Sequence, residues 1–220
     1  MTEFANDIAK RLLEIEAVKI STDPPFTWTS GIKSPIYCDN RKLISYPDHR
    51  KAVVMGWKTL IEQKVAGGEM TMPDVLGGTA TAAIPWAAFL AYEMNLPMVY
   101  IRPEPKAHGA GKQIEGDLKA GQNVLIVEDL ISTGGSSVKA AQAVRDEGQC
   151  TVTDIFSIMH YEMQKATDRF AEANLTLTNL TGFSSLLGVA KELGTITAEQ
   201  EAMVLKFSED PPTWADRVGL

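Results

Sequence analysis

The sequence predicts an α/β fold with a mostly parallel central sheet flanked by helices. Short apolar runs typical of buried strands alternate along the chain with segments whose apolar residues recur at helical spacing. Loops rich in glycine, hydroxyl or other small residues directly follow two of these runs, at 77–83 and 132–137. In parallel α/β sheets such loops meet at the carboxyl edge of the strands, where ligands bind. We therefore expect a binding site at that edge.

The composition favours one domain with an appendage. The chain has 220 residues, of which 45% are hydrophobic, enough to bury a full core. Its net charge of −7 and the lack of a basic tract interleaved with aromatic residues argue against nucleic acid as a partner. Cys38 and Cys150 are too isolated for a disulfide framework or a zinc site. No secretory signal or apolar run of about 18 residues is found, so we expect a cytoplasmic protein without a membrane span.

Helices are predicted from apolar periodicity and from residues that start or stop a helix. The first is expected at 3–18, the second at 47–65 and a further one at 138–147, with an alanine-rich helix after 79–85. Thr197 and Gln200 fit a capping box for the last helix, and Trp214 is expected to pack the C-terminal tail on the body. Trp57 is expected in the core.

Strands are predicted at 74–78, 98–101, 124–127, 151–159 and 174–180. Residues 102–122 show neither period and contain several prolines and glycines. Because connections longer than roughly 12–15 residues are usually functional lids or disordered, we expect this segment to be a lid. Its cationic first half contains Arg102, Lys106, His108 and Lys112.

The segment 124–137 carries the strongest functional signal. The apolar run at 124–127 is followed by Glu128 and Asp129, where the strand is expected to end, and then by a serine-, threonine- and glycine-rich loop. Backbone N–H groups and the helix dipole at such a loop attract an anion, and Gly134 and Gly135 allow close approach to a phosphate. Carboxylates beside a phosphate site fit sugar hydroxyls or a metal-bound ligand. The pattern therefore indicates a phosphorylated ribose.

This segment resembles the phosphoribosyl-pyrophosphate (PRPP) signature of the type I phosphoribosyltransferases. An ordinary strand–turn–helix with chance acidic residues is the alternative, which the contiguous order of the three features disfavours. Residues 26–35 match a second pattern, Phe-Thr-x-x-Ser-Gly-x-x-Ser-Pro, which is similar to the hood of orotate phosphoribosyltransferases. The resemblance implies transfer of the 5-phosphoribosyl group from PRPP to orotate, giving orotidine 5′-monophosphate and pyrophosphate in UMP synthesis.

A third pattern, Arg-x-x-x-Lys-x-His-Gly, begins at Arg102 and resembles the catalytic loop of the same family. Cations held against a leaving pyrophosphate stabilise its growing charge, and His108 could donate a hydrogen bond or a proton. In the family this loop reaches into the active site of a second subunit, so the resemblance implies a homodimer. A closing loop also shields the activated sugar from water.

The chain departs from the family where several members have substrate-contacting cations. Thr29, Ala82 and Pro103 stand where such members have lysine, and no arginine occurs at 160–162. Lys33 is a candidate substitute for the hood lysine, and the charge at the 79–83 loop must come from elsewhere. For His160 we expect a structural, hydrogen-bonded role, with a place in the pocket as the alternative.

The resemblance implies an N-terminal helix and hood segment at 1–45 and a phosphoribosyltransferase core at 46–220, with the C-terminal helices placed to pack on the hood. It implies Mg²⁺ carried mainly by PRPP, with no dedicated protein metal site. The implied catalytic residues are Lys106, His108 and Asp129. The implied substrate-binding residues are Arg102, Lys106, His108, Glu128, Asp129, Leu130, Ile131, Ser132, Thr133, Gly134, Gly135 and Ser136. Alternatives are another PRPP-dependent nucleobase phosphoribosyltransferase or a non-catalytic PRPP-sensing regulator.

Overall fold

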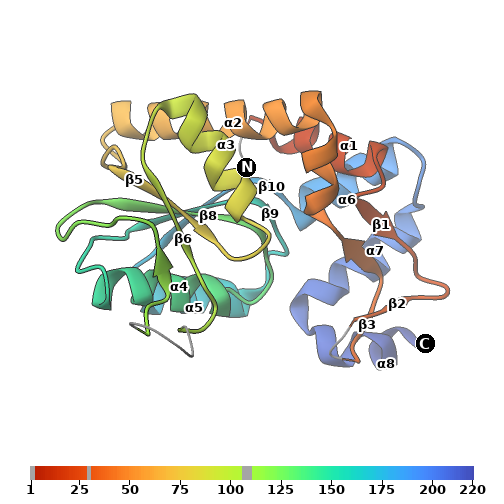
Figure 1. Ribbon diagram of the computed structural model, residues 1–220. Coiled ribbons are helices and arrows are strands. Elements are labelled where there is room, and N and C mark those ends of the chain that lie inside the picture. The colour runs from red at the N-terminus through yellow and green to blue at the C-terminus, as the bar shows by residue number, and fades with distance from the viewer. Residues whose placement is uncertain (1–2, 29–30, 106–110) are drawn as a thin grey trace.

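A six-stranded sheet runs through the centre of the computed structural model, which describes residues 3–28, 31–105 and 111–220 (Figure 1). The strand order is β10-β9-β8-β5-β6-β7, and every pair is parallel except β6 with β7. The strands are β5 (Val75–Thr79), β6 (Met98–Ile101), β7 (Ile114–Glu115), β8 (Val124–Ile131), β9 (Asp154–His160) and β10 (Thr176–Gly182). The predicted α/β fold with a mostly parallel sheet is therefore confirmed.

Helices cover both faces of this sheet (Figure 1). One face carries α1 (Ala5–Glu14), α2 (Pro47–Ala66) and α3 (Ile84–Met94), and the other carries α4 (Gly135–Asp146) and α5 (Gln164–Glu172). The first part of β8 alternates accordingly: Leu125 and Val127 join the α2–α3 core, whereas Val124 and Ile126 join the α4–α5 core. Trp57 is fully buried in the first core, as predicted.

A smaller unit lies beside the sheet, at the right of Figure 1. Here β1 (Val18–Ile20) pairs with β4 (Ile36–Cys38), β2 (Phe26–Thr27) pairs with β3 (Lys33–Ser34), and η1 (Asn40–Ser45) leads back to α2. The C-terminal elements α6 (Phe183–Glu192), α7 (Ala198–Glu209), η2 (Pro211–Thr213) and α8 (Trp214–Val218) lie in the same region, with α8 and η2 against β3. We call β1–β4 the hood.

The C-terminal tail packs through Trp214, as predicted. The indole is fully buried, packs edge-to-face on Phe207, and donates from Nε1 to the Met203 carbonyl at 2.9 Å. The predicted capping box is also present, because Thr197 and Gln200 each bond the backbone of the other. Among the described residues, no helix is long and apolar enough to cross a membrane.

Several predicted boundaries are wrong. The central strand does not end before Glu128 but continues to Ile131, so that both carboxylates lie within β8. The segment 102–122 contains the short strand β7, which pairs with β6. The helix expected from 138 begins at Gly135, and the first helix ends at Glu14. The last two strands begin later than predicted, at Asp154 and Thr176.

Candidate active site

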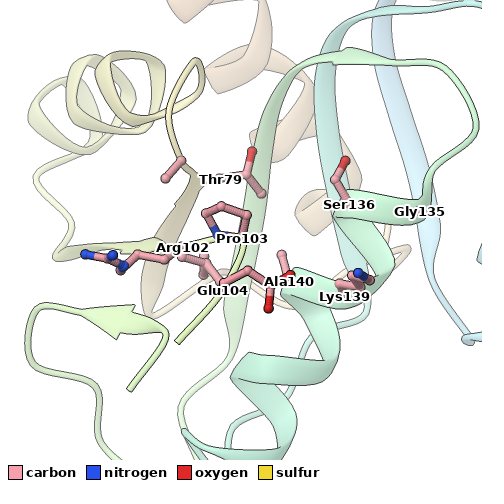
Figure 2. Close-up of a pocket in the computed structure, with 10 residues that line it drawn as sticks. Thr79, Arg102, Pro103, Glu104, Gly135, Ser136, Lys139 and Ala140 are labelled. Atoms are coloured by element: carbon pink, nitrogen blue, oxygen red, sulfur yellow. The ribbon is translucent and has the colours of Figure 1, made fainter. Parts of the chain in front are cut away.

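The two loops singled out in the sequence meet at the carboxyl edge of the sheet, as expected. A cavity of about 350 Å³ lies between the end of β5, the segment after β6 and the first turns of α4 (Figure 2). The cavity has three walls: Thr79 and Ala80 form the first, Gly135 and Ser136 the second, and residues 102–104 the third. Parallel pairing of β5 with β8 explains this meeting, because both strands deliver their carboxyl ends to the same edge.

Glu128 is almost completely buried, with 5% of its surface exposed. Its carboxylate accepts a short hydrogen bond from the Thr79 hydroxyl and another of 2.8 Å from the Ser137 hydroxyl. Burial raises the pKa of Glu128 to about 7, although both hydroxyl contacts favour the ionised form. This side chain therefore connects the end of β5 to the first turn of α4.

Asp129 has a different environment, since its residue is only half-buried. Burial raises the pKa of Asp129, and hydrogen bonds from the backbone N–H groups of Leu130 and Asp129, followed by the charge of Arg41, oppose part of that rise. Its backbone carbonyl accepts a hydrogen bond of 2.6 Å from the Asn40 side chain of η1. Of the two neighbouring carboxylates, Asp129 is the one whose oxygens are more accessible to a ligand.

The loop after β8 contains Gly134 and Gly135 and is contacted by side chains of α5. Gly134 has a φ of +71°, a backbone conformation that favours glycine, and a Cβ there would lie 3.1 Å from the Phe170 ring. Arg169 donates from Nη1 to both the carbonyl and the hydroxyl of Thr133, at 2.9 and 3.1 Å. The backbone N–H groups of the first turn of α4 then face an anion that approaches the loop.

The remaining residues of the predicted phosphate loop differ in how far their side chains are exposed to a ligand. Ser132 and Thr133 are half-buried and Ser136 is exposed at the cavity. Ile131 is buried in the α4–α5 core, and Leu130 packs on the other core. These two side chains are therefore committed to packing, which leaves only their backbone groups to a ligand.

Of the predicted cations Arg102, Lys106 and His108, the structure describes only Arg102. Arg102 lines the cavity, but its guanidinium points away from Ser136 and pairs with Glu115 of β7 at 3.6 Å (Figure 2). Lys139, which the sequence analysis did not single out, lines the opposite wall. Its position in the second turn of a helix that follows a phosphate-type loop is the signal that could have identified it. Lys106 and His108 lie outside the described residues.

Lys33 does not point freely into solvent in the hood. Its Nζ donates to the Thr27 hydroxyl at 3.0 Å across the β2–β3 hairpin. Thr29 lies outside the described residues. The prediction of a hydrogen-bonded His160 is wrong for one ring nitrogen: the residue is buried, and its Nε2 has no partner in the described part of the chain. Burial lowers the pKa of His160.

The carboxylates do not form a multidentate metal cage. Across 3–28, 31–105 and 111–220, no three His, Cys, Asp or Glu side chains gather closely enough to hold a metal ion. Asp129 is the more exposed of the two carboxylate residues of β8, and a single carboxylate suits a cation carried largely by another ligand.

Comparison with known proteins agrees with this geometry. Residues 48–169 match the family described as the phosphoribosyl transferase domain. The orotate phosphoribosyltransferase of Enterococcus faecalis OG1RF is 46% identical over 216 residues, which cover 97% of this chain and 99% of that protein. The Streptococcus mutans enzyme of that name is 47% identical over 97% of this chain and 99% of its own length. The crystal structure of orotate phosphoribosyltransferase from Aeropyrum pernix superposes with a TM-score of 0.70 at 28% identity, covering 86% of this chain and 99% of that one.

Proposed function

This chain belongs to the orotate phosphoribosyltransferases, and from that membership we infer that it transfers the 5-phosphoribosyl group from PRPP to orotate. The products are orotidine 5′-monophosphate and pyrophosphate, in the synthesis of UMP. The observation that carries this conclusion is the identity of 46% with an orotate phosphoribosyltransferase along 97% of the chain. The cavity at the carboxyl edge of the sheet supports it independently.

The reaction requires the ring nitrogen of orotate to bond to the anomeric carbon of PRPP while the bond from that carbon to the pyrophosphate oxygen breaks. We assign the ribose 2′- and 3′-hydroxyls to Glu128 and Asp129. Asp129 is the more exposed of the two residues, since it is half-buried whereas Glu128 is buried. In this assignment the Asp129 carboxylate would lie beside the anomeric centre, where its negative charge would stabilise the positive charge that develops as the bond breaks.

The loop from Ser132 to Ser136 is assigned to the 5′-phosphate. Its support is the positive φ of Gly134, the bracing of Thr133 by Arg169 and the amino end of α4. Together these present backbone donors to a dianion without side-chain obstruction. Ser132, at the start of the loop, is placed next to the pyrimidine in this assignment.

We propose Mg²⁺ as the cofactor, bound mainly by PRPP oxygens and water. Asp129 is the residue that would contact it or its water shell, and the ion would neutralise charge on the diphosphate. The residues of the chain then bind, orient and shield the substrates.

We propose that the protein works in the cytoplasm as a homodimer in which Arg102, Lys106 and His108 act at the partner subunit's site. Arg102 points away from the loop that follows β8 within its own chain, which is in keeping with that role. A mixing experiment tests the exchange: Lys106→Ala and Asp129→Asn each remove one half of a shared site. In a randomly mixed dimer population, about a quarter of the wild-type activity should return, because half of the dimers then hold one intact site. No recovery after verified subunit exchange would contradict a shared loop.

The substrate assignment is tested with purified protein, PRPP and Mg²⁺ against orotate, uracil, hypoxanthine and adenine. Of these four bases, we expect only orotate to give pyrophosphate release. Turnover of a purine or of uracil in place of orotate would replace the assignment with another nucleobase. PRPP binding without any turnover would indicate a sensor.

A further inference from the structure

The turn between β5 and α3 lacks a cation of its own. Residues 79–83 read Thr-Ala-Thr-Ala-Ala, and all of them are neutral. The proposed function places the diphosphate of PRPP near this turn, where negative charge grows as the bond to the sugar breaks. Neutral backbone donors alone leave much of that charge uncompensated, so a cation from another element is needed.

Arg41 of η1 lies at this turn. A second cavity, of about 460 Å³, is lined by Arg41, Ile44, Thr81, Ala82 and Pro85. Of these residues only Arg41 is charged, and its side chain is 63% exposed. The amino end of α3, an 11-residue helix, opens onto the same cavity through Pro85, and its dipole also favours an anion there.

The segment that carries Arg41 is fixed to the ribose-binding strand. Asn40, the preceding residue, is 1% exposed, donates from Nδ2 to the carbonyl of Asp129 at 2.6 Å and accepts from the Cys38 thiol at 3.2 Å. This anchor places Arg41 close enough to Asp129 for their charges to interact. The position of the arginine is therefore set by the core of the site.

The guanidinium itself is only partly used by the protein. Its Nε donates to Asp39 Oδ1 at 2.6 Å, and that carboxylate oxygen also accepts from the Arg41 backbone N–H at 3.3 Å. The two terminal nitrogens have no hydrogen-bond partner in the described part of the chain. Asp39 thus orients the group and leaves one edge open, the arrangement in which arginine binds a phosphate through two parallel hydrogen bonds.

We propose that Arg41 binds the diphosphate of PRPP against the Thr81–Ala82 turn and stabilises it as it leaves. The proposal rests on the proposed function. Thr79 and Ala80 line the first cavity, with Arg102 and Lys139, whereas Thr81 and Ala82 line the second, with Arg41. The turn therefore lies between a cavity that Lys139 lines and a cavity that Arg41 lines. The diphosphate, rather than the orotate carboxylate, is the ligand, because this cavity is walled by the β5–α3 turn and not by the hood hairpin.

The test compares Arg41→Gln and Arg41→Lys with the matched control Lys42→Gln. Lys42 is the adjacent cation in η1, but its Nζ donates to the Glu16 carbonyl at 3.0 Å and it does not line the cavity. The measurements are KM for PRPP, KM for orotate and the inhibition constant of inorganic pyrophosphate. Thermal unfolding of each variant verifies its fold.

Arg41→Gln should raise KM for PRPP and the pyrophosphate inhibition constant about tenfold each, the usual effect of losing a charged hydrogen bond to phosphate. KM for orotate should stay unchanged. Arg41→Lys should fall between the wild type and Arg41→Gln, since an ammonium keeps the charge without the paired donors. Lys42→Gln should match the wild type.

Unchanged KM for PRPP and an unchanged inhibition constant in a folded, active Arg41→Gln variant would overturn the proposal. A rise confined to KM for orotate would also overturn it, by assigning Arg41 to the base. Failure of the Arg41 proposal and failure of the proposed function give different results. If the wild-type protein does not turn over orotate, the proposed function is wrong. Calorimetric binding of inorganic pyrophosphate to wild type and Arg41→Gln then still decides whether Arg41 holds that anion.

Discussion

Two adjacent carboxylates on β8 do different work because their surroundings differ. Glu128 is buried and receives hydroxyl hydrogen bonds from Thr79 and Ser137, whereas Asp129 is half-buried and accepts hydrogen bonds from backbone N–H groups. Thr79 ends β5 and Ser137 lies in the first turn of α4, so Glu128 connects the two loops to which we assign the diphosphate and the 5′-phosphate. A buried carboxylate that is fully hydrogen-bonded can order its neighbours even though its ionised form is poorly solvated.

The ionisation of Glu128 makes stability depend on pH in a defined direction. Its pKa is about 7 in the folded protein against an ordinary value of 4.5, so the folded state holds the proton more tightly than the unfolded chain. This contribution therefore favours folding at low pH and is lost as the pH rises from about 4.5 through about 7.

Replacing Glu128 by Gln removes this titration while keeping the shape of the side chain. The unfolding free energy of Glu128→Gln relative to wild type should increase by about 2–3 kcal/mol between pH 5 and pH 8. Urea unfolding at the two pH values measures the difference, and Asp129 is present in both proteins as an internal control. A difference that is independent of pH would show that Glu128 titrates normally.

At the scale of elements, α5 braces the phosphate loop from the face opposite the ligand. Arg169 of α5 donates to the carbonyl and the hydroxyl of Thr133, and the Phe170 ring packs against Gly134. The brace lies outside the loop in sequence, 36 residues from Thr133. Backbone N–H donors cannot be reoriented by side-chain rotation, so a site that uses them needs a loop of fixed conformation. The contacts from Arg169 and Phe170 help to fix this loop.

Arg169→Met should loosen this loop while preserving the apolar stem of the side chain. We expect KM for PRPP to rise about tenfold, a loss comparable to one or two charged hydrogen bonds, with a smaller change in KM for orotate. The matched control is Arg145→Met. Arg145 donates to the carbonyls of Val152 and Ala173 away from the loop, so its loss should lower stability and leave KM for PRPP unchanged. Equal KM values in wild type and Arg169→Met would argue against the brace.

Local sequence patterns predict most helices and strands around the site, but they do not predict the side-chain contacts that hold these elements together. The strand-loop-helix order at 124–147 is readable because apolar runs, glycines and helical spacing are all local signals. The extension of β8 through Glu128 is not readable, since acidic residues are depleted in strands and the hydroxyls that accommodate this one come from Thr79 and Ser137. Strand β7 was missed for a similar reason: its two residues are ordered by pairing with β6.

The same limit applies to the candidate site. The glycines, hydroxyls and acids of the loop were identified from residue types that occur together in sequence. Arg41, Lys139 and Arg169 reach the site from three different elements, and no local spacing links them to 132–136. Conversely, Leu130 and Ile131 were included by their position, although their side chains serve the two cores.

At the scale of the whole molecule, aromatic rings connect the C-terminus to the end of the sheet. Trp214 packs on Phe207, Phe207 on Trp28 of the hood, Trp28 on Tyr161, and Tyr161 on Phe183, with ring centroids 5.3–5.9 Å apart. Such pairs add to the free energy gained from burial. The last helices therefore hold the hood against the strand ends that carry the site.

Removing the first ring of this series should weaken the whole arrangement. Trp214→Ala should lower the unfolding free energy by about 3–5 kcal/mol, the usual cost of deleting a large buried aromatic side chain. Trp214→Phe should cost less, because it keeps most of the packing and loses the hydrogen bond to the Met203 carbonyl. Chemical denaturation measures both. A Trp214→Ala value within about 1 kcal/mol of wild type would show that the tail does not hold the hood.

The placement of Trp28 gives the molecule its own optical reporter. Of the four tryptophans, Trp57, Trp86 and Trp214 are fully buried, whereas Trp28 lies partly exposed in the hood, between Tyr161 and Phe207. A displacement of the hood would change the polarity around this indole, whereas Trp57 and Trp86 are fully buried on α2 and α3, outside the hood. A shift in the fluorescence emission of Trp28 would therefore report a change in the packing of the hood, without an added dye.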